Sequence, residues 1–313
     1  MTRLRIGLLD SGLGLVGFAD AVATRAPHAD LLLAMDPQNM PYGALTAGRL
    51  TEVVLRSARA LAAWQPDAIV VACNTASVHT LGTLRAELEP RIPIIGTVPA
   101  IKPAAATGRP FAVWATDATT ASDYQRKLID AFAADVPVAR IAASGLAEAI
   151  EAGSPARIEA AIAEAADATP PDVASVVLGC THYGLVADRI VRALEARGIR
   201  EVALFDSPAA VAAQTLRRVT ADQRAEDAVA ATGTGTGGPG GGEGAQTSRR
   251  GRILAVYQSG ESGRLPAVLN EYPVGRRLLD LEQTADAGTD PTPDGVAHPV
   301  HPGGRAPVES EME

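Results

Sequence analysis

The chain has 313 residues, which is room for about two domains of ~100–200 residues each, and a formal net charge of −8. Hydrophobic residues make up 47% of the chain and aromatic residues only 4%, a composition that favours helices packed on sheets over an aromatic-rich β protein. The acidic balance argues against a general nucleic-acid-binding protein.

The start of the chain is apolar but is interrupted by Asp10, which is not typical of a secretory signal. No segment reaches the ~18 uninterrupted apolar residues of a membrane span. We therefore expect a soluble, cytoplasmic protein without membrane contact. Cys73 and Cys180 are the two cysteines of the sequence, too few for a disulfide framework, and cytosolic thiols are normally reduced.

The first motif is LLDSGLGLVG at 8–17, whose three glycines have G-x-G-x-x-G spacing. It spans the end of a predicted strand at 5–10 and the start of a predicted helix at 15–24. A second predicted strand ends at Asp36, about 20 residues further on, where a dinucleotide-binding fold places its ribose ligand. An NAD-binding enzyme is therefore one hypothesis.

Two polar residues in the same motif argue against a dinucleotide. Asp10 and Ser11 lie between the strand and the first glycine. A carboxylate there would face the helix N-terminus where the pyrophosphate should bind, and the like charges would repel each other. Asp-Ser-Gly at the end of a strand is better interpreted as a polar catalytic corner.

Short aliphatic runs alternate with alanine-rich helical stretches along the chain, which predicts an α/β fold with parallel sheets covered on both faces. The clearest further helices are expected at 51–64 and 156–168. The predicted strands share a β-branched or leucine-rich composition and lie at 5–10, 31–36, 68–74, 92–98, 111–116, 175–181, 202–207 and 252–260.

A glycine-rich stretch at 231–245 is flexible by composition, and we interpret residues 231–250 as a surface insertion. From about Thr284 the tail is rich in Pro, Gly, Asp and Glu, and we expect residues 284–313 to be disordered. His298 and His301 lie in this tail with no further ligand nearby, so no metal site is predicted.

The two cysteines occur in matching segments, 67–88 and 173–194. Each segment has an apolar run, a small residue, the cysteine, a polar residue and a helix-like stretch. Both thiols are thus expected at the C-terminal ends of strands and just ahead of helices, where open α/β sheets bind ligands and where a helix N-terminus favours a thiolate. A buried cysteine that only fills the core is the alternative for either residue.

Two equivalent thiols suit a reaction with mirror symmetry. One thiol removes a proton from a carbon and the other delivers a proton to the opposite face, as in a racemase or epimerase. A cysteine protease has no use for the second thiol, and the C-x-x-C redox spacing is absent. The chain has only Lys102 and Lys127 as possible Schiff-base lysines, and neither has a context that favours pyridoxal phosphate.

The chain resembles the cofactor-independent aspartate/glutamate racemases. The resemblance covers roughly residues 5–215 and keeps the order of the family's motifs. The paired CNTAS and GCTHY motifs are highly specific, whereas DSG alone is weak. The motifs are LLDSGLG, MPYG, VVACNTAS, GTVPAIKPA, WATDATTASDY and VLGCTHYGLV.

The resemblance implies two pseudo-symmetric α/β domains with the active site between them. We expect one domain to comprise residues 1–97 and about 206–283, and the other residues 98–205. The implied activity is the interconversion of L- and D-glutamate by a two-cysteine mechanism without a cofactor, supplying D-glutamate for peptidoglycan. An aspartate or other amino acid racemase, an NAD-binding enzyme and a catalytically silent relative stay open as alternatives.

The resemblance also implies roles for individual residues. Cys73 and Cys180 would be the acid/base pair, with Asp10 assisting the former and His182 the latter. Glu151, in AIEAG, would support Cys180, although an exposed carboxylate at a helix end is the alternative. Residues that would bind substrate offer hydroxyl, amide or backbone donors: Asp10, Ser11, Tyr42, Gly43, Asn74, Thr75, Thr116, Thr119, Thr120, Thr181 and His182.

The expected partner is the small amino acid substrate, and a homodimer is an open alternative to a monomer. No nucleic acid, membrane, metal or cofactor is expected. The chain departs from the usual family pattern at Leu15, which follows Gly14 in place of a further glycine, and at Ala143 and Ser144, where a Cys-Pro pair is common. None of these departures removes a residue that the chemistry needs.

Overall fold

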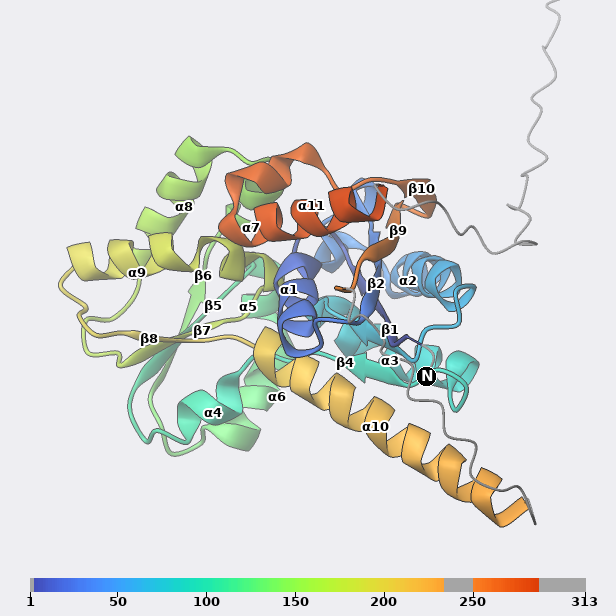
Figure 1. The fold of residues 1–313 in the computed structure, drawn as a ribbon. Coiled ribbons are helices and arrows are strands. Elements are labelled where there is room, and N and C mark those ends of the chain that lie inside the picture. The colour runs from blue at the N-terminus through green and yellow to red at the C-terminus, as the bar shows by residue number, and fades with distance from the viewer. Residues whose placement is uncertain (1–2, 234–249, 287–313) are drawn as a thin grey trace, which may run out of the picture.

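The computed structural model describes residues 3–233 and 250–286, and it contains two sheets flanked by helices (Figure 1). The first sheet has the order β10-β9-β2-β1-β3-β4, with all neighbours parallel except the antiparallel pair β9 and β10. Its strands are β1 (Arg5–Asp10), β2 (Asp30–Met35), β3 (Ala68–Val71), β4 (Ile94–Gly96), β9 (Ile253–Gln258) and β10 (Glu261–Gly263).

The second sheet is entirely parallel and has the order β6-β5-β7-β8. It therefore repeats the β2-β1-β3-β4 order of the first sheet, which confirms the prediction of two related α/β domains. We call the six-stranded sheet and its helices domain 1, and the four-stranded sheet and its helices domain 2. The strands of domain 2 are β5 (Phe111–Ala115), β6 (Val138–Ala142), β7 (Ser175–Leu178) and β8 (Ala203–Phe205).

Helices connect the strands as parallel sheets require. The α-helices are α1 (Leu15–Arg25), α2 (Ala47–Ala62), α3 (Asn74–Leu88), α4 (Ile101–Ala105), α5 (Asp117–Ala121), α6 (Asp123–Phe132), α7 (Leu146–Glu151), α8 (Pro155–Asp167), α9 (Ala187–Ala196), α10 (Pro208–Gly233) and α11 (Pro273–Asp286). Short 3₁₀ helices are η1 (Pro37–Asn39), η2 (Tyr42–Ala44), η3 (Thr181–Val186) and η4 (Ala267–Glu271).

The central strands are buried on both faces, which explains their continuous apolar sequences. Every residue of β2, β3, β5 and β7 is buried. The main core cluster runs through both domains and includes Leu8 of β1, Trp114 of β5 and Ile150 of α7. One continuous core cluster therefore joins the two sheets.

The chain crosses between the sheets twice, after β4 and after β8. A hydrogen bond from Thr97 Oγ1 to Ser207 Oγ, 2.9 Å long, ties the two crossing segments together. The expected domain boundaries, near 97 and 206, fall in these connections, and we retain them as a proposal. The helix α10 then packs along α1 in domain 1 (Figure 1).

The structure corrects several predicted elements. The edge strands β6 and β10 were not predicted, because β6 is only partly buried and β10 is exposed, so neither has the apolar run of a central strand. The helix α2 begins four residues before the expected start at Thr51, at a position where Thr46 caps it by accepting from the Arg49 backbone. Residues 231–233 of the predicted insertion continue α10, and residues 284–286 of the predicted disordered tail belong to α11. The rest of the insertion, apart from Arg250, and the tail beyond Asp286 lie outside the described residues.

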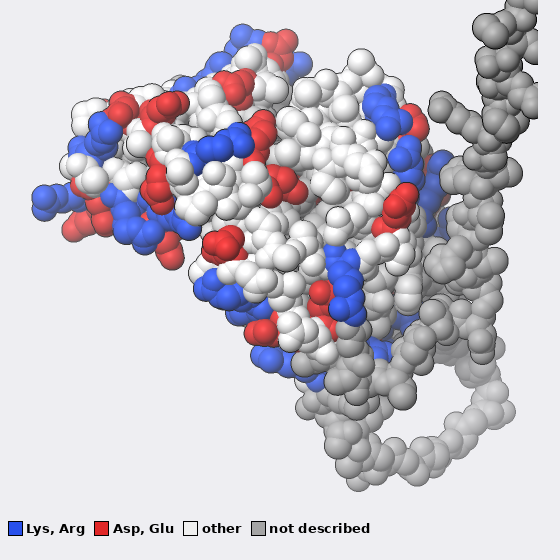
Figure 2. All heavy atoms as spheres, turned by 90° about the horizontal axis from the view of Figure 1, so that it is seen from above, with Lys and Arg blue, Asp and Glu red and all other residues white. Residues whose placement is uncertain are grey.

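Figure 2 shows the molecule from above, where basic and acidic side chains are interspersed over the visible face. No helix among the described residues is long and apolar enough to cross a membrane.

Candidate active site

The site forms where the C-terminal ends of the strands of the two sheets face each other. Asp10 ends β1 and Cys73 follows β3 in domain 1, while Thr116 follows β5 and Cys180 follows β7 in domain 2. A cavity of about 230 Å³ lies between them. The predicted residues that line it are Ser11, Tyr42, Gly43, Cys73, Asn74, Thr75, Thr116, Thr119, Cys180, Thr181 and His182.

Cys73 lies in the connection between β3 and α3 and is only 6% exposed. Burial and the neighbouring Asp10 carboxylate raise the pKa of its thiol, and a hydrogen bond from the Ala76 backbone opposes them only in part. The expectation that the helix N-terminus would favour a thiolate here is therefore wrong. In this environment Cys73 is held as a thiol.

Asp10 is 1% exposed and connects the two domains. Its Oδ1 accepts a hydrogen bond of 2.6 Å from the Ser11 backbone, and its Oδ2 accepts one of 3.0 Å from Thr181 Oγ1. Burial raises the pKa of the Asp10 carboxyl, despite the opposing effects of His182 and of these hydrogen bonds. Asp10 and Cys73 thus form a pair of buried acidic groups that favours retaining protons.

Cys180 is half-buried, and its Sγ lies 3.8 Å from Nδ1 of His182. The other ring nitrogen, Nε2, lies 2.8 Å from Oε2 of Glu151. Burial alone would lower the pKa of His182, but the interactions with Cys180, Glu151 and Asp10 outweigh it and raise the pKa well above the ordinary value. As an imidazolium, His182 donates from both nitrogens, one toward the sulfur and one to the carboxylate.

Glu151 ends α7 and does not line the cavity, but it holds His182 from behind. The same oxygen accepts a 2.9 Å hydrogen bond from the Leu13 backbone of domain 1. The structure therefore brings Glu151 into the network around Cys180, as the resemblance implied.

The close packing of this network explains two glycines of the first motif. A Cβ atom at Gly12 would overlap the Glu151 carboxylate, and one at Gly14 would overlap Thr181 Oγ1 and Asp10 Oδ2. A Cβ at Gly17 would meet only a side-chain atom of Pro208, at 3.6 Å. The first two glycines let the loop approach domain 2 closely, and the space they leave is filled by protein side chains and not by a cradle for a pyrophosphate.

Comparison with known proteins agrees with this geometry. Residues 17–215 match the family model described as Asp/Glu/Hydantoin racemase. Glutamate racemase of Pseudomonas entomophila is 36% identical over 217 residues, which cover 68% of this chain and 80% of the relative. The chain belongs to the Asp/Glu/Hydantoin racemase family. It is an amino acid racemase, and hence an isomerase.

Solved structures resemble this racemase in fold. Glutamate racemase of Escherichia coli, crystallised with L-glutamate and the activator UDP-MurNAc-Ala, has a TM-score of 0.60 and 29% identity, covering 70% of this chain and 83% of that one. Glutamate racemase of Francisella tularensis in complex with D-glutamate has a TM-score of 0.63 at 20% identity, covering 90% and 95% of the two chains.

Several groups in the racemase's cavity are placed to bind a polar ligand. Asn74 donates from Nδ2 to the Gly179 carbonyl at 2.9 Å, while its Oδ1 is buried without a partner among the described residues. That oxygen is available to accept from a substrate ammonium group. The hydroxyl of Tyr42 instead donates to Asp36 at 3.1 Å, so it is already engaged by protein.

Thr120 differs from the other predicted threonines of this racemase. Its hydroxyl donates to the Ile141 carbonyl at 3.4 Å, and the residue does not line the cavity. Thr116 and Thr119 do line it and are hydrogen-bonded to each other at 3.0 Å. The structure therefore does not bring Thr120 to the site.

Sequence reasoning missed two acidic residues that line the cavity, Asp117 and Glu148. Ser144 holds Asp117 by donating to its Oδ1 at 2.6 Å. Asp117 lies within the quoted motif at 114–124, but a carboxylate at the start of a short helix is ordinarily a surface feature, and nothing in the sequence marks it as part of a cavity. Apolar lining comes from Met40, Pro41, Ala44, Ala118 and Ala147.

No group of three or more His, Cys, Asp or Glu side chains within residues 3–233 and 250–286 could hold a metal ion. His298 and His301 lie outside that part of the chain.

Proposed function

We propose that this racemase interconverts L- and D-glutamate without a cofactor, using Cys73 and Cys180 as its two acid/base groups. The observation that carries the proposal is the placement of the two thiols at equivalent strand ends of two related sheets, on the lining of one cavity. Its relatives named as glutamate racemases support glutamate as the substrate.

The differing surroundings of the thiols suggest how the reaction starts. Cys73 has a raised pKa and is the proton donor, because burial and Asp10 disfavour its thiolate. Cys180 faces the His182 imidazolium, which supplies the positive charge that a thiolate base requires. Cys180 would remove the α-proton of one enantiomer while Cys73 protonates the opposite face.

After that turnover the roles of the thiols are exchanged, since Cys180 carries the abstracted proton and Cys73 has given up its own. The other enantiomer is the substrate of this second form, as microscopic reversibility demands. Glu151 holds His182 in place in both forms, and Asp10 occupies the corresponding position beside Cys73.

The α-proton of an amino acid is very weakly acidic, so the site must stabilise the developing negative charge. Thr75 and Thr119 offer neutral hydroxyl donors around the cavity, and hydrogen bonds to a charged group contribute about 1.5–3 kcal/mol each. Fixed donors in a space that excludes water stabilise the transition state more than mobile water does. The D-glutamate formed would supply peptidoglycan precursors in the cytoplasm.

The test is to incubate the full-length protein with L-glutamate in D₂O, without added cofactor, and to follow optical rotation and α-deuterium incorporation. We expect wild type to racemise and Cys73→Ala and Cys180→Ala to lose at least ~10²–10⁴-fold in turnover. Ser175→Ala is a matched control, because Ser175 Oγ is buried in β7 without a partner among the described residues and its loss should leave turnover unchanged.

Racemisation that survives the loss of either cysteine would refute the two-thiol mechanism. If wild type leaves glutamate unchanged but racemises L-aspartate, the substrate assignment is wrong while the chemistry stands.

A further inference from the structure

A second cavity, of about 690 Å³, lies in domain 1 away from the cysteines. It is formed at the N-terminal ends of β2 and β9, between the C-terminal half of α1 and the middle of α11. The cysteines follow the opposite ends of the strands. At ~3.3 Å per residue, the six residues of β1 alone separate the two ends of the sheet by about 20 Å. The volume is in the range of small-molecule sites, ~300–1,000 Å³.

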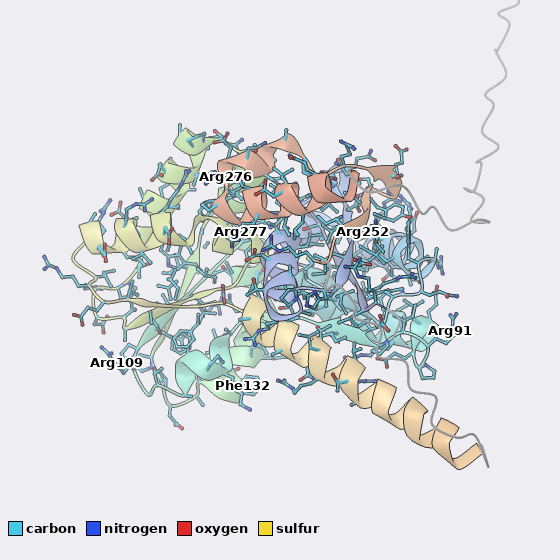
Figure 3. All side chains as sticks on the ribbon, viewed as in Figure 1. Arg91, Arg109, Phe132, Arg252, Arg276 and Arg277 are labelled. Atoms are coloured by element: carbon cyan, nitrogen blue, oxygen red, sulfur yellow. The ribbon has the colours of Figure 1, made fainter. Side chains whose placement is uncertain are left out.

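Four arginines line this cavity, which we call the arginine cavity: Arg3, Arg250, Arg252 and Arg277. Two carboxylates, from Asp20 and Asp280, line it as well. The excess of positive charge is local, since the whole chain has a net charge of −8. Arg252 and Arg277, which come from β9's N-terminal side and from α11, are labelled in Figure 3.

The existing ion pairs use only part of this charge. Arg277 binds Asp20 through two hydrogen bonds of 2.8 and 2.7 Å, and Arg3 lies 3.4 Å from Asp30. The Nε of Arg252, in contrast, is buried and has no partner within the described ranges. Neither Arg250 nor Arg252 forms an ion pair with a carboxylate of the described residues, so the charge of both is available to an anionic ligand.

The backbone that carries Arg250 and Arg252 is fixed before any ligand arrives. Gly251 donates to the Pro27 carbonyl at 2.7 Å, and the Arg252 carbonyl accepts from Leu31 at 2.9 Å. A Cβ atom at Gly251 would overlap the Ala29 carbonyl, so only glycine allows this close approach. The two arginines therefore flank a rigid contact, and binding does not require ordering of the backbone between them.

We propose that the arginine cavity binds a small organic phosphate, with the phosphate group at Arg252 and Arg250. The planar guanidinium group matches phosphate oxygens in a bidentate manner, and a phosphate would balance the charge of two arginines that form no ion pair among the described residues. Asp280 places negative charge elsewhere on the wall, so the uncharged, hydroxyl-bearing part of the ligand faces it. The site is separate from the thiols and does not depend on the proposed glutamate racemase activity.

Isothermal titration calorimetry with ribose 5-phosphate as the probe tests this proposal on the full-length protein at constant ionic strength. We expect saturable binding to wild type, no binding of ribose, and at least tenfold weaker binding of ribose 5-phosphate to Arg252→Gln. Arg250→Gln is the second variant, because an exposed side chain can be replaced without disturbing the fold. Arg109→Gln, an exposed arginine of domain 2 labelled in Figure 3, is the matched control and should bind as wild type does.

The proposal is overturned if ribose 5-phosphate does not bind to wild type, or if both cavity variants bind it as tightly as Arg109→Gln does. Binding of citrate with no binding of ribose 5-phosphate would overturn the assignment to phosphate. Because binding is measured without turnover, a protein inactive on glutamate would still give a clear result.

Discussion

The two cysteine corners of this racemase have the same backbone plan and different chemistry. Cys73 follows β3 and Cys180 follows β7, which occupy equivalent places in the matching strand orders β2-β1-β3-β4 and β6-β5-β7-β8. Cys73 is nevertheless buried beside the carboxyl group of Asp10, whereas Cys180 is half-buried beside the imidazole of His182. An α-helix begins directly after Cys73, and a 3₁₀ helix follows Cys180.

This difference shows how two sheets with matching strand order can place their cysteines in surroundings that favour different protonation states. The proposed two-thiol mechanism requires one thiol to be protonated while the other is ionised, and identical surroundings would favour the same state for both. The carboxylate beside Cys73 and the cation beside Cys180 remove that degeneracy. The comparison therefore predicts that changing either neighbour alters activity without removing a thiol.

The largest effect is expected from Asp10→Asn, which removes the charge beside Cys73. We expect kcat to fall about 100-fold in both directions, in line with the loss of a general acid–base partner. The fold should become more stable at pH 7. Burial raises the pKa of Asp10 above its ordinary value of 3.8, so its ionisation destabilises the folded state as pH rises through that raised pKa, and asparagine cannot ionise.

Thermal unfolding of Asp10→Asn and wild type at pH 4 and pH 7 measures this effect on stability, and the gain in stability of the variant should be larger at pH 7. A variant that is less stable than wild type at pH 7 would contradict the assigned shift.

A somewhat smaller loss is expected from Gly14→Ala, compared with Gly17→Ala in the same loop. The new Cβ at position 14 would displace Thr181 and Asp10 from each other, so kcat/KM should fall at least tenfold. At position 17 the Cβ has ordinary contact with Pro208, and activity should stay near wild type. Steady-state kinetics of the two variants measure this difference in kcat/KM. Equal losses of kcat/KM in both variants would show that the effect comes from the helix backbone and not from the contact of position 14 with Thr181 and Asp10.

Glu151→Gln tests the other corner through its pH dependence. The Glu151 carboxylate helps to raise the pKa of His182 above the ordinary 6.5. Replacing this carboxylate should lower the pKa of His182, so that the imidazolium loses its proton at a lower pH. We expect the high-pH limb of kcat/KM to move to lower pH, with about a tenfold loss above it. A pH–rate profile that keeps its shape in the variant would rule out Glu151 as the support of His182.

The same interaction has a consequence for stability. A histidine with a raised pKa stabilises the fold fully below pH 6.5, and this contribution is lost as pH rises through the folded-state pKa. Glu151→Gln should thus be less stable than wild type at pH 6, by a margin that shrinks as pH rises.

The smallest effect is expected at Thr120, compared with its neighbour Thr119. Thr119 lines the cavity, and the loss of a hydrogen bond to a charged substrate should raise KM about tenfold in Thr119→Ala. Thr120 does not line it, so KM in Thr120→Ala should stay within about twofold. If the two variants raise KM equally, the short helix α5 acts as a unit and the distinction is lost.

The sequence predicted the central parts of this molecule well because buried parallel strands have an unmistakable pattern. The expected strand at 5–10 agrees with β1 residue for residue, and the two cysteines lie at the strand ends where they were expected. The edge strands β6 and β10 were missed, since an edge strand with exposed faces has no apolar pattern to detect.

Contacts between residues far apart in the sequence could not be derived from the sequence. Glu151 was named only through resemblance, because nothing in AIEAG indicates a partner 31 residues away. The state of Cys73 was mispredicted for a similar reason. A helix N-terminus can be seen in the sequence, but the burial and the approach of Asp10 that outweigh it depend on the fold.

Three hydrogen bonds join the domains across the cavity, from Thr181 to Asp10, from Leu13 to Glu151, and from Asn74 to Gly179. They involve the groups that tune the thiols, so any separation of the domains that admits an amino acid must also take the catalytic network apart. The network that surrounds the two thiols is then complete only while the two domains are in contact. In the proposed mechanism, proton transfer at either thiol would therefore require the closed arrangement of the domains.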